Sequence, residues 1–235
     1  MRWLAACGLV LLLSGCAGNP TPASASPPAQ ATLPDPTAAG PLHWTRAEYD
    51  FGQYLVDDAR LAVYHYTVPV RGSIHAPDGP GPFPLLLFLH GRHGTCTYAS
   101  VQFLSPGACP NATVVEPIDS YRGYDYLAEN LASHGYAVAS IDANTINDRD
   151  LAGDSGANAR GRLVLRTLDE FASVNATGAS LPDQPGAPTV LPRAEVPQLK
   201  GRLDLSRTGI MGHSRGGEGV ARAAVLDHEI GRAHV

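Results

Sequence analysis

Five consecutive apolar residues, Leu-Leu-Leu-Phe-Leu at positions 85–89, place the strongest constraint on the fold of this chain. A strand in which every side chain is apolar is typical of a sheet that is covered on both faces. Residues 137–141, apolar except for Ser140, indicate a second buried strand, and residues 207–211 are expected to form a third strand. Apolar residues at helical spacing mark three further segments, 124–131, 159–172 and 217–227. Strands that alternate with helices predict an α/β fold with a doubly wound, mostly parallel sheet.

The length and composition of the chain predict one domain of catalytic size. The 235 residues are 44% apolar and 17% charged, which is enough for one buried core and too little for two large domains. We expect this domain to occupy residues 42–229, beginning with strands within 61–76, where apolar and polar residues alternate. The formal net charge of -5 is spread along the chain, without a block of Lys and Arg. A nucleic acid is therefore not expected as a partner.

The N-terminal residues have the pattern of an export signal. Arg2 precedes an apolar run at 4–13, which is long enough for a signal peptide and too short to span a bilayer. The run ends in Leu-Ser-Gly-Cys, which resembles the bacterial lipobox, so residues 1–15 are expected to be a lipoprotein signal peptide and Cys16 its lipidated residue. Residues 16–41, rich in Pro, Ala and Ser, are expected to form a tether. The mature protein would then be exported and anchored through Cys16 to the membrane of the cell envelope; an ordinary secretory signal is the alternative.

Two cysteines remain in the predicted domain, Cys96 and Cys109. In the oxidising environment that export implies, two cysteines separated by a short loop predict a disulfide. A metal site is a weaker alternative because it requires more ligands, and a catalytic thiol would need a partner that the neighbouring residues do not offer.

The pentapeptide Gly-His-Ser-Arg-Gly at 212–216 is the centre of the predicted chemistry. It follows a short apolar strand and opens a helix, the setting in which a sharp turn lifts a serine hydroxyl above a sheet. Side chains at Gly212 and Gly216 would collide with the neighbouring strand and helix. We therefore expect Ser214 to be a nucleophile. The alternative is a Gly-rich turn in which the serine is incidental.

A second segment, His-Gly-Arg-His-Gly at 90–94, directly follows the most apolar strand. In hydrolases whose nucleophilic serine lies in such a strand-to-helix turn, the loop at that place donates a backbone N–H to the oxyanion that forms during the reaction. We expect the backbone N–H groups of Arg92 and Arg215 to form this oxyanion hole. His90 is a less suitable general base, because in this fold the base follows the nucleophile; it is expected to pin the loop by hydrogen bonds instead. The same argument applies to His213.

Several segments together resemble a known family. They are Ile-Asp-Ala-Asn-Thr at 141–145, Ala-Arg-Gly-Arg at 159–162, Asp-Leu-Ser-Arg at 204–207 and Met-Gly-His-Ser at 211–214. These are similar to segments of the cutinase-type polyester hydrolases of actinobacteria and their dienelactone-hydrolase-like relatives, which belong to the α/β-hydrolase superfamily. The resemblance implies a serine esterase with a shallow cleft that has no lid, acting on a small or polymeric ester.

The chain departs from that family at three places. Arg92 and Arg215 stand where the polyesterases usually have an aromatic residue and a methionine, and the loop between Cys96 and Cys109 is an addition. Loss of the two apolar contacts argues against plastic or cutin as substrate. Arginine beside the cleft would favour a polar or anionic acyl group.

The sequence predicts that the catalytic acid and histidine are missing from this chain. In this fold both follow the nucleophile at the ends of later strands, and only 21 residues follow Ser214. Asp227 and His228 belong to the nucleophile helix and are not expected to reach it. Residues 230–235 resemble a translated sequencing adapter, so we expect a non-native tail, with a genuine helix end as the alternative. The domain would be C-terminally truncated and the fragment inactive.

Three classes of function stay open at this point. Ester hydrolysis through an acyl-enzyme on Ser214 is the first prediction. An acyltransferase or peptidase would use the same nucleophile, and a non-catalytic, surface-binding lipoprotein could retain the same fold. No metal or organic cofactor is indicated. The acidic residues between the second strand and the second helix are interpreted as loop caps, namely Asp142, Asp148, Asp150 and Asp154.

Overall fold

The computed structural model of the chain describes residues 35–57, 65–105, 109–110, 114–149, 154–189 and 192–227. The chain divides into two compact units, Met1–Pro36 and Thr37–Val235, and every described helix and strand belongs to the second. The predicted signal peptide, the lipidation site Cys16 and the tail at 230–235 lie outside the described residues. No described helix is both long enough and apolar enough to cross a membrane.

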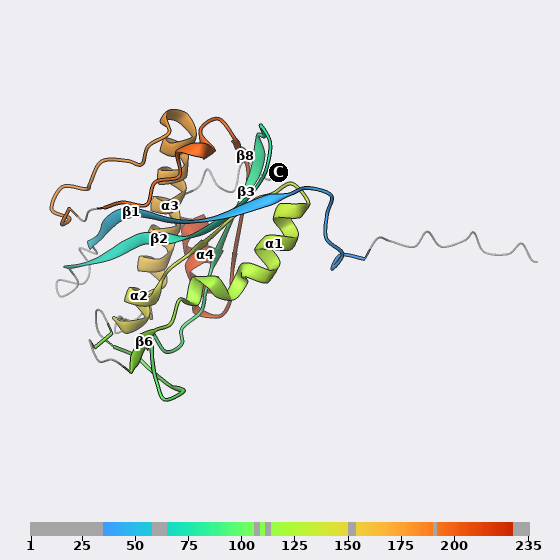
Figure 1. Cartoon of the computed structure of the whole chain (residues 1–235). Helices are drawn as coiled ribbons and strands as arrows, with labels where there is room; N and C mark the ends of the chain where they lie inside the picture. Colours follow the sequence, from blue (N-terminus) through green and yellow to red (C-terminus); the bar gives the residue numbers. More distant parts are fainter. Residues whose placement is uncertain are drawn as a thin grey trace, which may run out of the picture. The chain divides into compact units, whose positions relative to one another are not determined.

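The centre of the described domain is a five-stranded sheet in the order β1-β2-β7-β3-β8 (Figure 1). Strands β7, β3 and β8 are parallel, whereas β2 pairs with β7 and β1 pairs with β2 in the antiparallel direction. The strands are β1 (Trp44–Asp57), β2 (His65–Pro77), β3 (Phe83–Leu89), β7 (Ala137–Ile141) and β8 (Leu203–Gly212).

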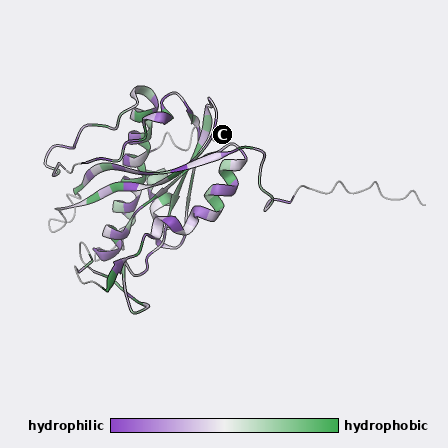
Figure 2. Ribbon diagram, viewed as in Figure 1, coloured by the Kyte–Doolittle hydropathy of each residue, from purple (hydrophilic) through white to green (hydrophobic). Residues whose placement is uncertain are grey.

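The apolar run in β3 is covered from both sides. Leu85, Leu87 and Leu89 are almost fully buried in the larger core, on the face where α3 (Ala157–Thr177) and α4 (Arg215–Leu226) pack. Phe88 points to the other face and packs with residues of α1 (Asp125–Ser133). Figure 2 shows apolar residues on strands of the sheet and on the helices that pack against it. The predicted α/β fold with helices on both faces is therefore confirmed.

The sheet is mixed, because its first two strands are antiparallel to their neighbours. Strand β1 was not predicted. Its buried side chains are Tyr49, Phe51, Tyr54 and Val56, and the strict period of two breaks between Phe51 and Tyr54. A register shift lies there between Asp50 and Gln53, where Gly52 has a φ of 94°. This bulge interrupts the alternation by which a strand is recognised in a sequence.

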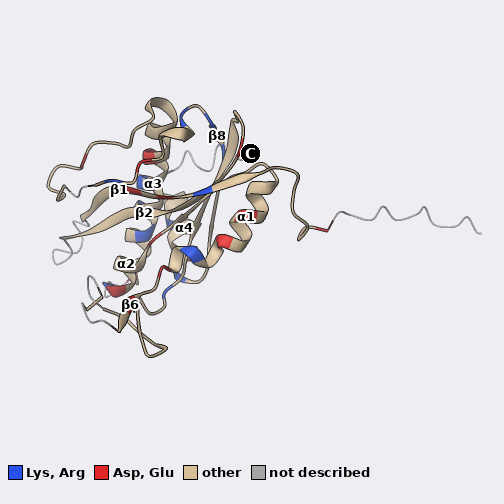
Figure 3. Ribbon diagram, in the orientation of Figure 1, with Lys and Arg blue, Asp and Glu red and all other residues tan. Residues whose placement is uncertain are grey.

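Charged residues are distributed over helices, strands and loops of the described domain (Figure 3).

Two further short elements follow β7 and α3. They are α2 (Asn144–Asp148) and the 3-10 helix η2 (Pro197–Leu199).

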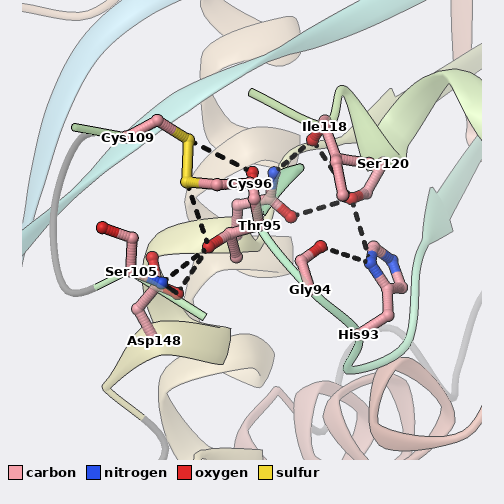
Figure 4. Close-up of a disulfide and its surroundings, with 10 residues drawn as sticks. His93, Gly94, Thr95, Cys96, Ser105, Cys109, Ile118, Ser120 and Asp148 are labelled. Atoms are coloured by element: carbon pink, nitrogen blue, oxygen red, sulfur yellow. Dashed lines mark hydrogen bonds between the residues drawn. A yellow bond between two sulfur atoms is a disulfide. The ribbon is translucent and has the colours of Figure 1, made fainter. Parts of the chain in front are cut away.

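A small insert follows β3 and carries the predicted disulfide. Three short strands form an antiparallel sheet in the order β5-β4-β6, and the 3-10 helix η1 (Ser120–Tyr124) connects it to α1. Cys96 and Cys109 are joined, with their Cα atoms 5.8 Å apart, which confirms the disulfide prediction (Figure 4). Thr95 Oγ1 donates a 2.7 Å hydrogen bond to Asp148 of α2. The strands are β4 (Cys96–Tyr98), β5 (Val101–Phe103) and β6 (Val115–Pro117).

Removing this disulfide should reduce the stability of the domain. A cross-link that closes a loop of this size contributes about 3 kcal/mol, mainly by restricting the unfolded chain. We expect the oxidised protein to unfold at higher urea concentration than both its reduced form and the variant C96S/C109S, which should coincide. Equal unfolding midpoints for the oxidised and reduced wild type would contradict the expectation.

Candidate active site

Ser214 lies in the turn between the end of β8 and the start of α4. Its φ of 53° and ψ of -123° are unusual for a residue with a side chain. Such a backbone conformation costs about 1–3 kcal/mol and persists only where the surrounding structure imposes it. The residue is exposed to solvent. The turn therefore presents the serine hydroxyl at the surface, at the carboxyl end of a parallel strand.

Two glycines make this turn possible. A Cβ atom built on Gly216 would lie 2.2 Å from the carbonyl oxygen of Leu89 and 2.7 Å from that of His90. A Cβ atom on Gly212 would lie 2.3 Å from the carbonyl carbon of Gly216. Real Cβ atoms do not approach backbone this closely. The first turn of α4 can therefore pack against the end of β3 only with glycine at both positions.

The loop at 90–94 lies against the serine turn. The backbone N–H of His213 donates a 3.2 Å hydrogen bond to the carbonyl oxygen of Leu89. A Cβ atom on Gly91 would lie 3.1 Å from Cβ of Ser214 and 3.0 Å from the carbonyl oxygen of His213. The structure therefore brings together the two segments, far apart in the chain, to which the sequence assigns chemistry.

Each predicted oxyanion donor directly follows a residue of this contact in the chain. Arg92 directly follows Gly91, and its side chain is exposed. Arg215 is the first residue of α4, where helical N–H groups have no acceptor in a preceding turn. Its guanidinium pairs with Glu218 at 3.1 Å, one turn along the helix. The oxyanion role of the two backbone N–H groups stays a prediction.

His90 pins the loop, as expected. The ring is buried, and its Nε2 accepts a 2.9 Å hydrogen bond from the backbone N–H of Ala143. Because a backbone N–H only donates, the ring proton is on Nδ1, which lies 2.9 Å from the carbonyl oxygen of Gly91. Both ring nitrogens are therefore used in fixing the loop. Among the described residues, no histidine or carboxylate is hydrogen-bonded to the hydroxyl of Ser214.

An ion pair between Arg71, which is about half exposed, and the buried Asp142 stabilises the neighbouring end of β7. Nε and Nη2 of Arg71 each lie 2.8 Å from Oδ2 of Asp142, and the backbone N–H of Asn144 donates a 2.8 Å hydrogen bond to Oδ1. Burial alone would raise the pKa of Asp142. The Arg71 guanidinium and the Asn144 N–H outweigh burial and hold the pKa of Asp142 below its usual value.

The acidic residues interpreted as loop caps accept hydrogen bonds from backbone N–H groups where the structure describes them. Asp154 accepts hydrogen bonds from the backbone N–H groups of Gly156 and Asn158, and Asp148 accepts one from that of Ser105. Within the described ranges, no three His, Cys, Asp or Glu side chains are grouped as metal ligands. Asp150 and His228 lie outside these ranges, and Asp227 is the C-cap residue that follows α4.

Two buried polar residues behind the loop were not singled out from the sequence. Asn147 Nδ2 donates a 3.2 Å hydrogen bond to the carbonyl oxygen of Gly91, and Arg160 Nη2 donates a 2.7 Å hydrogen bond to Oδ1 of Asn147. Asn147 belongs to α2, a helix too short to leave a periodic signal. The sequence did contain one indication that Arg160 is buried. It precedes Val164 by one helical turn and therefore lies on the apolar face of its helix.

The strand order, the helices on both faces and the serine turn define an α/β fold that carries a hydrolase-like strand-turn-helix unit. Over 99 residues, the chain is 34% identical to a bis(hydroxyethyl) terephthalate hydrolase of Streptomyces coelicolor. It is 31% and 32% identical, also over 99 residues, to the cutinases est2 and est1 of Thermobifida alba. These curated homologues are cutinase-type esterases of the α/β-hydrolase superfamily, as the resemblance predicted.

The matched region has a limited extent. It covers 42% of this chain and 23% or 24% of each relative, so the chain spans about a quarter of the length of these proteins. No family model matches the chain.

Replacement of Arg71 by Met should weaken the domain in a pH-dependent way. The lowered pKa of Asp142 means that the ion pair stabilises the fold above pH 3.8, the usual value, and that this contribution is lost as the pH falls through the lowered value. Because Arg71 is about half exposed, we expect a loss of about 2 kcal/mol near pH 7, less than for a fully buried pair.

The pH dependence distinguishes this ion pair from a packing effect. The difference in unfolding free energy between wild type and R71M, measured by urea unfolding from pH 7 to pH 3, should shrink below about pH 4. Arg207 pairs with Asp204 on the surface, so R207M is the matched control and should differ little from wild type. A constant difference across this pH range would contradict the assignment.

Proposed function

We propose that this protein is an exported serine hydrolase that cleaves carboxylic esters through an acyl-enzyme on Ser214. The observation that carries the proposal is the strained, exposed turn of Ser214 in contact with the Gly91 loop. Strained backbone of this kind clusters at active sites, and at Ser214 the close packing of Gly212, Gly216 and Gly91 imposes it. The curated homologues are ester hydrolases, which supports the same reaction class.

The proposed reaction follows from the groups around Ser214. Its Oγ attacks the ester carbonyl while a histidine takes the hydroxyl proton, and that proton then goes to the departing alcohol. The negative charge on the tetrahedral intermediate is stabilised by the backbone N–H groups of Arg92 and Arg215. Water, activated by the same histidine, hydrolyses the acyl-enzyme and restores the hydroxyl.

The histidine and its acidic partner are proposed to follow the nucleophile in the chain, outside the residues that the structure describes. A serine hydroxyl is a weak nucleophile at neutral pH without a base. The described residues alone would therefore bind an ester and stabilise its oxyanion without turning it over.

The proposed substrate is a small or polymeric ester. The names of the relatives describe hydrolysis of a terephthalate ester and of cutin. In this chain, Arg215 directly follows Ser214, and Arg92 directly follows Gly91, which packs against Ser214. Two arginines that adjoin the serine turn favour an ester with a polar or anionic acyl group.

Export and anchoring through Cys16 are proposed from the N-terminal sequence. The disulfide between Cys96 and Cys109 supports a location outside the cytoplasm, because disulfides persist in oxidising compartments. The same N-terminal pattern supports a lipid anchor in the cell envelope rather than release into the medium.

A fluorophosphonate probe tests the nucleophile directly in the full-length gene product. We expect the probe to label the wild type on Ser214, and S214A to lose both labelling and at least about 10⁴-fold of the turnover of p-nitrophenyl esters. The control is S206A, which alters an exposed serine on β8, the strand before the Ser214 turn. It should keep both the labelling and the turnover.

Three results would count against the proposal. Labelling that persists in S214A would reject this residue as the nucleophile. A wild type that the probe does not label would favour the non-catalytic, surface-binding lipoprotein, and turnover of amides in preference to esters would favour a peptidase.

A further inference from the structure

The direction of one peptide group in the loop after β3 is set by its carbonyl. The carbonyl oxygen of Gly91 lies 2.9 Å from Nδ1 of His90 and 3.2 Å from Nδ2 of Asn147, and both donors are buried. In a trans peptide, the C=O and the following N–H point in opposite directions. Two buried donors that fix the Gly91 carbonyl therefore also direct the N–H of Arg92 the opposite way within the peptide plane, away from Asn147.

The orientation of the Asn147 amide is itself determined. A guanidinium only donates hydrogen bonds, so the oxygen of the amide must face Arg160, whose Nη2 lies 2.7 Å from it. The NH₂ group is then left to face the Gly91 carbonyl. Asn147 and Arg160 have no measurable exposure, so water does not compete for these contacts.

Arg160 is positioned by the helix that begins at the nucleophile. A Cβ atom on Gly219 of α4 would lie 2.5 Å from Cβ of Arg160, which shows how closely α4 packs on this residue. Nη1 of Arg160 donates a 2.7 Å hydrogen bond to the carbonyl oxygen of Ser155. A continuous series of contacts therefore leads from α4 through Arg160 and Asn147 to the carbonyl of Gly91, the residue that packs against Ser214.

We propose that Asn147, supported by Arg160, is a positioning residue that holds the Gly91–Arg92 peptide with its N–H directed at the oxyanion. This inference rests on the proposed function and adds residues that contact neither the substrate nor Ser214. If the peptide rotated by half a turn, the Gly91 carbonyl would replace the Arg92 N–H at the site. The oxyanion would lose one hydrogen-bond donor, and its negative charge would be repelled by a carbonyl oxygen.

The variant N147D separates the positioning role from a structural one. The introduced carboxylate has nearly the same shape and pairs with Arg160, but it cannot donate to the Gly91 carbonyl. Loss of one oxyanion donor typically lowers kcat by about 10²–10³-fold, and the remaining bond from His90 should limit the effect to about 10–100-fold. KM for p-nitrophenyl esters should stay within about twofold, because only the transition state carries the oxyanion.

A thionoester substrate gives the readout that a structural defect would not change. Sulfur accepts hydrogen bonds more weakly than oxygen, so an intact oxyanion hole favours the ester over the matched thionoester. In N147D this preference should fall by about the same factor as kcat. A general loosening of the fold would lower both turnover numbers equally and leave the preference unchanged.

The matched control is N158D. Asn158 is also a buried asparagine whose Oδ1 accepts a hydrogen bond from an arginine, Arg222 Nε at 3.3 Å, and the donor to the Gly91 carbonyl is Asn147. We expect wild-type kcat and wild-type ester preference in N158D. If N147D folds poorly, N147A removes the same donor without adding a charge, and the same results are expected of it.

The outcomes distinguish this inference from the proposed function. If a folded Asn147 variant has wild-type kcat or an unchanged preference for the ester, the positioning role is overturned. Labelling of Ser214 by the probe would still support this residue as the nucleophile. Absence of labelling in the wild type overturns the proposed function, and the inference with it. A loss of kcat and of ester preference in N147D but not in N158D supports it.

Discussion

The parallel pairing of β3 with β8 is the contact on which the candidate site depends. Leu89 and Gly212 are partners at the carboxyl ends of the two strands, so the loops that follow them begin side by side. Glycine stands where the two segments meet, at Gly91 in the loop after β3 and at Gly216 in the first turn of α4. A single strand pairing therefore explains why the serine turn, the start of α4 and the His90 loop occupy one place, although more than a hundred residues separate them in sequence.

Buried polar groups stabilise this edge of the sheet from behind. His90 joins the loop to Ala143, Arg71 neutralises Asp142, and Asn147 connects Gly91 to α3. Polar groups buried in this way rigidify a structure when their hydrogen bonds are satisfied and are costly when they are not. The edge can therefore hold the strained backbone of Ser214, which an adaptable loop would allow to relax.

Much of this architecture could be predicted from the sequence because its signals are local. The apolar runs of β3 and β7, the helical spacing of α1, α3 and α4 and the glycines around Ser214 each lie within a few residues, and the structure has these elements close to their expected positions. The pairing of Cys96 with Cys109 followed from counting cysteines and from the expected compartment.

The missed features depend on contacts between distant residues. Strand β1 is hidden by its bulge at Gly52, and the three strands of the insert are too short to show periodicity. In the sequence, Asn147 is an ordinary polar residue, and only the folded structure shows that its side chain donates to the Gly91 carbonyl. Such roles follow from packing, and local propensity says nothing about them.

The central claim is that Ser214 works beside a pair of directed backbone donors. A crystal structure of the full-length protein, with a phosphonate bound covalently to Ser214, tests it most directly. The account predicts a phosphoryl oxygen about 2.7–3.1 Å from the backbone nitrogens of both Arg92 and Arg215, with the Gly91 carbonyl still turned toward Asn147. A phosphoryl oxygen directed into solvent, or one that faces the Gly91 carbonyl, would contradict it.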